Sequence, residues 1–337
     1  MKSKRELVTR VLHGEDAGTI PVGLWHHFME YKDMNSALTD PAVFAKNLAG
    51  QRVYKEAYQP DFVKIMTDGL FFLPYSYAGF RQAKDFKNLQ VVDSQNEWIR
   101  KNVELVRQVR ALYGEDILIL FNVFSPYQHI RDAIRFEQDI PMSVDKMPVF
   151  LSQDRDVMAA AMEVMAEGLC NLIREVVQPG RADGIYLALT DWFESIPLEL
   201  YKECICPAER KIMDFANTLS DCNVVHLCGD FGSNVRRFFE MYNEYGACAV
   251  NWAIGQTKIT MEEGRRLFPG KTLIGGFDNS PKGVLMTGSK EEVQAQTERI
   301  LQTAGRTGLI LGADCTIPAA FDTQRLAWIR EAAAGRN

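Results

Sequence analysis

Long apolar runs are missing from this sequence of 337 residues, and none approaches the roughly 20 residues that a membrane-spanning helix requires. The opening segment, MKSKRELVTRVLHGED, is charged and amphipathic and lacks the apolar stretch of a secretory signal. Basic residues form no stripe, and a formal net charge of -6 gives no electrostatic footprint for a nucleic acid. We therefore expect a cytoplasmic protein that binds neither membranes nor nucleic acids.

Cysteine is sparse, and linkers are absent. The seven cysteines are Cys170, Cys204, Cys206, Cys222, Cys228, Cys248 and Cys315. Scattered in this way, with no secretory signal, they do not form the framework of a disulfide-rich secreted protein, and reduced or metal-bound thiols fit better. No internal repeat, low-complexity tract or Ser/Gly linker marks a boundary, so we expect residues 1–337 to form a single domain.

Short runs rich in Val, Ile, Leu and Phe recur between helical patterns, which is typical of a parallel sheet with crossover helices. The predicted strands are 20–25, 62–66, 117–121, 184–189, 224–228, 247–252, 272–276 and 309–313. The predicted helices between them are 41–58, 95–112, 157–177, 207–218, 233–245, 261–268 and 290–303. Eight strands in this alternation predict an α/β fold, a (β/α)8 TIM barrel, with a doubly wound open sheet as the alternative.

Two segments lie outside this alternation. Helix 6–12 precedes the first strand and is an N-terminal helical extension. After the third strand, residues 126–155 form a long connection that carries Pro126, Pro141 and Pro148. A connection of this length predicts an insertion that acts as a lid or cap.

In such a barrel the chemistry is expected where the strands end, because the loops of the C-terminal face vary without disturbing the core. For orienting a substrate, or for acid–base chemistry near pH 7, we predict His26, His27 and His129. Asp68 ends the second strand, and Asn251 and Asp278 follow later strands as candidates for substrate contacts. Packing in the core remains the alternative for each histidine.

His226 and Cys228 are two residues apart in VVHLCGD, and residues i and i+2 of a strand point to the same face. Cys315 follows the last strand in LILGADCTIP, and closure of a barrel brings all strand ends around one mouth. One imidazole and two thiolates with an open fourth position form a set that suits catalytic zinc. The competing interpretation is that the cysteines are small buried hydrophobes. For the fourth ligand, Glu240, Glu244 and Asp278 are candidates, and none is favoured.

Aromatic side chains crowd the predicted mouth. They include Trp25, Phe28, Phe71, Phe72, Tyr75, Tyr77, Phe124, Tyr127, Trp192 and Phe193. We expect Trp25, Phe124 and Trp192 to contact a substrate, since such a lining suits an apolar or aromatic ligand. No Arg or Lys stands at a strand end to bind a sulfonated thiol, which favours a methoxylated aromatic or a similar small methyl donor.

With the motifs HLCGD, NWAIG, IGGFDNSP and GADCTIP, the sequence resembles the uroporphyrinogen decarboxylase superfamily and, within it, the zinc-dependent corrinoid methyltransferases. The resemblance covers nearly the whole chain. His226, Cys228 and Cys315 match the zinc ligands of those methyltransferases residue by residue. Asp68, in VKIMTDGL, matches an aspartate of the decarboxylases and is a candidate catalytic residue. The arginine-rich segment that decarboxylases carry after the first strand reads PVGLWHHFMEY here and has no arginine.

The resemblance implies a methyltransferase that uses Zn²⁺ and moves a methyl group between a small thiol or O-methyl compound and a corrinoid, such as methylcobalamin, on a partner protein. Zinc in this role is a Lewis acid that lowers the pKa of a bound thiol. Two other functions stay open. One is a decarboxylase that works without a metal, and the other is a barrel that binds a corrinoid or methyl-carrier protein without chemistry.

Overall fold

Eight parallel strands form the centre of the computed structural model, which describes residues 3–191 and 195–335. They are β1 (Val22–Gly23), β2 (Phe62–Ile65), β3 (Leu118–Phe124), β4 (Gly184–Asp191), β5 (Val224–Gly229), β6 (Ala249–Trp252), β7 (Thr272–Phe277) and β8 (Leu309–Ala313). Their order in the sheet is β1-β8-β7-β6-β5-β4-β3-β2, so β2 to β8 are neighbours in chain order and β1 pairs with β8. This order confirms the predicted barrel and excludes a doubly wound sheet, whose strand order reverses at a switch point.

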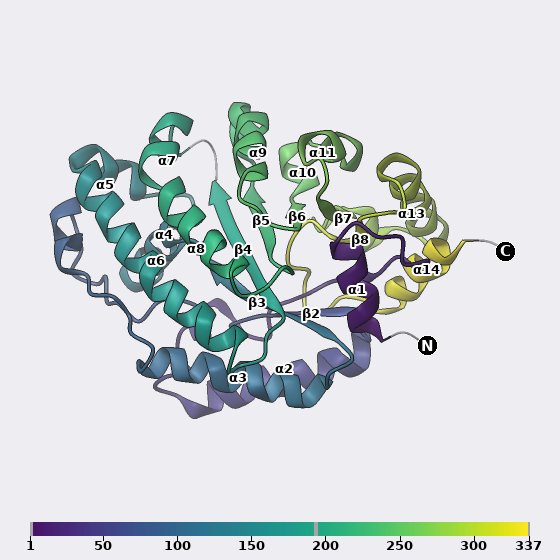
Figure 1. The fold of residues 1–337 in the computed structure, drawn as a ribbon, viewed down its shortest axis with the longest axis horizontal. Coiled ribbons are helices and arrows are strands. Elements are labelled where there is room, and N and C mark those ends of the chain that lie inside the picture. The colour runs from purple at the N-terminus through teal and green to yellow at the C-terminus, as the bar shows by residue number, and fades with distance from the viewer. Residues whose placement is uncertain (1–2, 192–194, 336–337) are drawn as a thin grey trace.

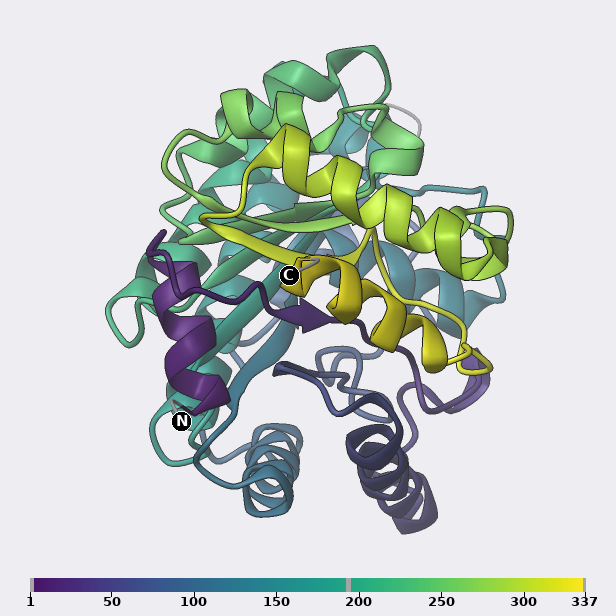
Figure 2. The same cartoon turned by 90° about the vertical axis from the view of Figure 1, so that its right-hand side faces the viewer.

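Helices cover the outside of the strands (Figures 1 and 2). They are α1 (Lys4–Leu12), α2 (Pro41–Tyr58), α3 (Glu97–Tyr113), α4 (Pro126–Gln138), α5 (Met147–Gln153), α6 (Arg155–Val177), α7 (Leu198–Cys204), α8 (Cys206–Asn217), α9 (Val235–Asn243), α10 (Ile254–Thr257), α11 (Met261–Leu267), α12 (Val284–Thr287), α13 (Lys290–Ala304) and α14 (Gln324–Ala334). Three short 3-10 helices are η1 (Tyr31–Asp33), η2 (Ala83–Asn88) and η3 (Gly232–Asn234). Each predicted helix is present, and its bounds are correct to within two residues. The sequence analysis gave no range for α14, which packs beside α13 (Figure 2).

Capping side chains fix where several of these helices begin. The Asp40 carboxylate accepts a hydrogen bond from the Ala42 N–H at the start of α2, and Asn96 and Asp154 cap α3 and α6 in the same way. Ser289 begins α13 with a reciprocal capping box. Such caps satisfy backbone N–H groups that have no partner within the helix, and each contributes about 1 kcal/mol.

The barrel closes between β1 and β2, which are the two ends of the hydrogen-bonded sheet. The Val22 N–H donates to the Asp61 carboxylate at 2.8 Å, and the Asp61 N–H donates to the Val22 carbonyl at 3.4 Å. Next to this contact, a Cβ atom on Gly23 would lie 2.1 Å from the Phe62 ring. Glycine is therefore the residue that lets β1 approach β2 closely enough to close the barrel.

β1 is much shorter than the predicted strand 20–25. The carbonyl of Leu24 accepts a hydrogen bond from the Tyr54 hydroxyl of α2, and the carbonyl of Trp25 accepts one from the Ile317 N–H at 2.9 Å. Both carbonyls are thus used outside the strand ladder. The apolar run continues past the point where the strand pairing ends.

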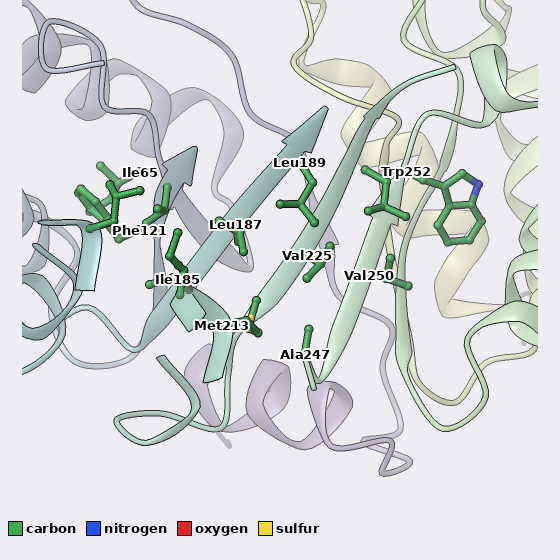
Figure 3. Close-up of a cluster of buried hydrophobic side chains, with 14 of the residues drawn as sticks. Ile65, Phe121, Ile185, Leu187, Leu189, Met213, Val225, Ala247, Val250 and Trp252 are labelled. Atoms are coloured by element: carbon green, nitrogen blue, oxygen red, sulfur yellow. The ribbon is translucent and has the colours of Figure 1, made fainter. Parts of the chain in front are cut away.

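Alternate residues along the strands build two separate cores. Ile185 and Leu187 of β4 and Val225 of β5 lie in the layer between strands and helices, with Met213 of α8 in the same cluster (Figure 3). Tyr186, between the first two, belongs to a second cluster inside the barrel. The period of two is what a strand with two buried faces requires.

Helix α1 covers the end of the barrel where the strands begin. Its residues Val8, Val11 and Leu12 belong to the inner cluster, and the hydroxyl of Thr272, the first residue of β7, donates to the Val11 carbonyl at 2.6 Å. The predicted N-terminal extension is thus part of the barrel interior. None of the described helices is long and apolar enough to cross a membrane.

The predicted insertion 126–155 contains α4 and α5. Residues 126–135 of α4 are all buried. His129 lies in this stretch, where its Nδ1 accepts a hydrogen bond from the Leu73 N–H at 3.3 Å, and burial lowers its pKa to about 3. The first third of the segment is thus buried in the molecule, and much of the rest is exposed. A lid role for 126–155, like a single domain over 1–337, stays a prediction.

Replacing Gly23 tests the closure of the barrel. We expect Gly23→Ala to lower the free energy of unfolding by roughly 1–3 kcal/mol, because the added methyl group overlaps the Phe62 ring. Gly79→Ala is the matched control, since a Cβ there meets no atom within 4 Å. Urea denaturation of both variants measures the effect. Equal free energies of unfolding for the two variants would show that the contact between β1 and β2 can accommodate an added methyl group.

Burial of neutral His129 predicts a specific acid sensitivity. The folded pKa lies below the unfolded value of about 6.5, so its contribution to stability is complete above pH 6.5 and is lost as the pH falls towards 3. We expect wild type to lose about 2 kcal/mol more than His129→Gln between pH 8 and pH 5. His13→Gln, at an exposed histidine, is the control and should keep the wild-type slope. Parallel unfolding curves for wild type and His129→Gln would contradict this role.

Candidate metal centre

His226, Cys228 and Cys315 converge at the mouth of the barrel. His226 and Cys228 alternate in β5 with the outward-facing Leu227, and Cys315 lies two residues beyond the end of β8. The Cys315 Sγ is 3.5 Å from His226 Nε2 and 4.0 Å from Cys228 Sγ. The structure therefore brings together the three residues that the sequence predicted as metal ligands.

The spacing of these atoms fits zinc. Zn–S bonds of about 2.3 Å and Zn–N bonds of about 2.0–2.1 Å at tetrahedral angles place two sulfurs about 3.8 Å apart, and sulfur and nitrogen about 3.5 Å apart. The structure has 4.0 Å and 3.5 Å for these pairs. His226 is buried and both cysteines are half-buried, so the set is accessible from the sulfur side. The residues present can hold this ion without rearrangement of the backbone.

The protein charges around this set favour one thiolate even before a metal binds. The pKa of Cys315 is held well below its usual range, first because the Cys228 thiol donates to its sulfur and then because of the charge of nearby His226. The same shared proton raises the pKa of Cys228. A divalent cation that displaces this proton gains both thiolates as ligands.

No fourth protein ligand is present among the described residues. No other His, Cys, Asp or Glu joins the three within 4.8 Å. Glu240 is exposed on α9, Glu244 pairs with Arg210 at 3.3 Å, and Asp278 accepts hydrogen bonds from Ser280. Three protein ligands with an open position are the arrangement of a catalytic rather than a structural zinc site.

His27 and Asp68 form a second polar group at the ends of β1 and β2. His27 Nδ1 lies 2.7 Å from Asp68 Oδ1, and the other carboxylate oxygen accepts the Phe28 N–H at 2.6 Å. Asp68 is fully buried, whereas the His27 ring is partly exposed. A carboxylate on Nδ1 fixes the tautomer that leaves Nε2 unprotonated, so His27 is arranged as a base.

The remaining predicted histidines lie away from open space. His26 is packed among Phe28, Tyr54 and Tyr58, and its Nδ1 bonds the His27 carbonyl at 2.9 Å. Burial lowers its pKa. His129 is held by Leu73, as described above. The structure does not bring these two side chains to the metal ligands, and their catalytic role stays a prediction.

The predicted substrate contacts fall in different places. Trp25 lies inside the barrel, and the Phe124 ring packs against Phe71 at a tilt of 48°, with ring centroids 4.4 Å apart. Asn251 is paired in register with His226, and its amide donates to the carbonyls of Ile274 and Ala313. Its buried Oδ1 has no partner among the described residues.

Two predicted substrate residues are less directly placed. Asp278 is held in the turn after β7 through Ser280. Trp192 lies outside the described residues. Contact of either side chain with a substrate stays a prediction.

A lysine inside the barrel, Lys64, was not among the predicted site residues. Lys64, in the middle of β2, is only 6% exposed, and its Nζ lies 4.4 Å from the centre of the Tyr186 ring and 4.9 Å from that of Trp25. Burial lowers its pKa to about 8, and the charges of Cys315 and Cys228 are the largest opposing influences. A charge within the apolar run FVKIM was the available signal, but only strand ends were considered.

A second cation comes from α4. Arg131 binds the Asp132 carboxylate through two nitrogens, at 2.8 Å and 3.0 Å, while its Nη1 is buried without a partner among the described residues. Its charge acts on Cys228 and lowers the pKa of that thiol. Nothing in the sequence separates this arginine from the solvated charges of other helices. Cations near the site therefore come from the middle of β2 and from α4, although none stands at the end of a described strand.

The fold is shared with methyltransferases of known structure. A methyltransferase from Methanosarcina mazei superimposes with a TM-score of 0.68 at 14% identity, over 98% of both chains. A B12-independent methionine synthase from Shewanella sp. W3-18-1, in complex with selenomethionine, gives 0.56 at 12% identity, over 94% of this chain and 97% of the other. At these identities the likeness is one of fold alone.

Sequence comparison gives a curated relative and a family. The relative is Methylcobamide:CoM methyltransferase MtbA from Methanosarcina mazei, 22% identical over 202 residues, with 59% of this chain and 53% of the relative aligned. The chain thus spans about half of that relative's length. The uroporphyrinogen decarboxylase (URO-D) family model matches residues 66–335, which include Asp68, His226, Cys228 and Cys315. This match extends over well more than half of the sequence, and the chain belongs to the URO-D family.

Proposed function

We propose that this protein is a zinc-dependent methyltransferase that moves a methyl group between a small thiol or O-methyl substrate and the corrinoid of a partner protein. The observation that carries the proposal is the convergence of His226, Cys228 and Cys315 at the spacing of tetrahedral zinc ligands. The relative named as a methylcobamide:CoM methyltransferase supports the reaction class.

Two groups of side chains have separate roles in the proposed reaction. Bound zinc supplies a Lewis acid that lowers the pKa of a substrate thiol or polarises an ether oxygen. His226, Cys228 and Cys315 would hold the ion, and with three protein ligands a position would remain for the substrate. His27, oriented by Asp68, accepts the proton that a thiol loses or returns one to a leaving oxygen through its Nε2.

The rim of the barrel supports docking of a partner. Among the large apolar side chains exposed on the described residues, Tyr31, Met142 and Val149 are 46%, 64% and 47% exposed. All three lie in segments between the end of a strand and the long crossover helix that follows it, α2 or α6, the kind of segment that forms the C-terminal face of a barrel. Such side chains suit the contact surface of a second protein that presents its corrinoid to the mouth.

Asp68 also supports a second candidate, a decarboxylase without a metal. The carboxylate is buried and fixed by His27 and the Phe28 N–H, in a family named for a decarboxylase. Against this candidate, the segment after β1 carries no arginine for a substrate with many acidic groups. The metal content of the protein separates the two functions.

Protein purified without added metal is expected to contain roughly one zinc per chain. Cys228→Ala and Cys315→Ala should each lose most of it and remain folded, because two ligands do not retain the ion. Cys170→Ala, at a buried cysteine of α6, is the matched control and should keep the metal. Elemental analysis with circular dichroism measures both properties. Full zinc in both site variants would defeat the ligand assignment, and folded wild type without zinc would favour the decarboxylase.

Asp68→Asn tests the assigned proton transfer. We expect kcat for methyl transfer with methylcobalamin to fall about 100-fold or more at unchanged zinc content, because an amide no longer favours the tautomer in which His27 Nε2 is free. Asp40→Asn replaces a capping carboxylate of α2 by a residue that caps equally well and should leave kcat unchanged. An active Asp68→Asn variant would remove the dyad from the mechanism.

A further inference from the structure

Lys64 is a buried cation without a counter-ion. Its side chain forms no hydrogen bond and no ion pair within 4.0 Å in the part of the chain that the structure describes, and its ammonium faces the rings of Trp25 and Tyr186. Removing an ammonium from water costs several kcal/mol unless it gains a partner, and aromatic faces return only about 2 kcal/mol. A charge kept at this cost indicates that a partner binds there during function.

Polar groups beside Lys64 also lack partners. The side-chain oxygen and nitrogen of Asn122 and the hydroxyl of Tyr186 are buried and unpaired among the described residues. Asn122 and Tyr186 are partners in the ladder between β3 and β4, and Lys64 is paired with Leu120, two residues before Asn122 on the same strand. The ammonium, the amide and the hydroxyl therefore line one wall of the barrel interior, and donors grouped in this way suit a negatively charged acceptor.

This wall adjoins the metal centre. The Tyr186 ring, whose centre is 4.4 Å from Lys64 Nζ, also lies 5.9 Å from the His226 ring, centre to centre. One aromatic ring thus separates the ammonium from a metal ligand. Two thiolates and a neutral imidazole on Zn²⁺ carry no net charge, so metal binding leaves Lys64 as an uncompensated charge in the site.

Other charges around the site are already engaged. Asp68, which acts electrostatically on Lys64, is held by His27 and by the Phe28 N–H. Arg131, the second cation near Cys228, is neutralised in part by Asp132. Arg131 keeps one unpaired nitrogen, Nη1, whereas Lys64 has no carboxylate within 4.0 Å among the described residues, so its whole charge is left for a ligand.

We propose that Lys64 is a specificity-determining residue whose ammonium binds an anionic head group of the substrate, a carboxylate or a sulfonate, while the reacting end of the substrate points to His226, Cys228 and Cys315. The position of the reacting end rests on the proposed function; the anion subsite does not. This inference replaces the expectation of an uncharged apolar methyl donor. The aromatic rings near the head group then serve as the walls of a narrow binding site for a short, charged molecule.

Isothermal titration calorimetry with two matched pairs of probes tests the subsite. The first pair is 3-mercaptopropionate and 3-mercapto-1-propanol, and the second, without sulfur, is propionate and propan-1-ol. We expect wild type to bind each anion about 10- to 100-fold more tightly than its neutral partner. Wild type that shows no preference in either pair overturns the proposal.

Variants assign the preference to one residue. Lys64→Met should abolish it while leaving zinc content and affinity for the neutral thiol unchanged, and Lys64→Arg should keep part of it. Lys64→Gln replaces Lys64→Met if the latter does not fold. Lys55→Met is the control, because Lys55 also faces an aromatic ring, Tyr113, but lies on α2 at the outside of the barrel. A preference that survives in both neutral variants overturns the assignment to Lys64.

The two proposals fail in distinguishable ways. Zinc content, measured on the same samples, reports on the metal centre. Anion preference for propionate over propan-1-ol reports on Lys64 without any metal–sulfur bond. Preference without zinc would defeat the methyltransferase proposal and leave the subsite standing, whereas zinc without preference would do the reverse.

Discussion

Closure of the barrel is the constraint on which the whole site depends. Cys315 follows β8 and His226 lies in β5, with β6 and β7 between them in the sheet. The 3.5 Å contact between their side chains requires the sheet to curve round into a barrel. The barrel closes where β1 meets β2, with the Phe62 ring against Gly23 and the Asp61 carboxylate bonded to the Val22 N–H. His27 and Asp68 lie just beyond the ends of these two strands, so the same closure brings them together.

Residues on the inner and outer faces of the strands affect the stability of the fold in opposite ways. Outward residues such as Leu187 and Val225 pack against helices and stabilise the fold, as apolar burial normally does. Inward positions hold Lys64, Asn122 and His226, each with a buried polar group that lacks a protein partner among the described residues. Unsatisfied groups of this kind destabilise the folded protein. Such groups also occur on outer helices, as at Gln51 of α2 and Asn102 of α3, but those inside the barrel lie beside the candidate metal centre, where a ligand can satisfy them.

Periodicity in the sequence determined most of the fold and part of the site. A two-residue spacing was enough to align His226 with Cys228, and the position after the last strand was enough to add Cys315. Periodicity could not predict where β1 ends. The carbonyls of Leu24 and Trp25 accept hydrogen bonds from Tyr54 and Ile317, which are distant in the sequence, and so do not continue the strand ladder. Lys64 and Arg131 were not predicted for a related reason: Lys64 lacks a counter-ion among the described residues and Arg131 keeps one unpaired nitrogen, and pairing is a property of the folded structure.

Helix α1 closes one end of the barrel and leaves the two ends different. Val8, Val11 and Leu12 fill the end where the strands begin, so the candidate metal centre formed by His226, Cys228 and Cys315 lies towards the other end of the barrel. A small molecule bound beneath a docked macromolecule would be trapped there until the larger body departs. The fold would then set the order of binding: the small molecule has to bind before the partner protein docks and can leave only after it dissociates. Such a geometry links turnover to the lifetime of a protein–protein encounter rather than to chemistry alone.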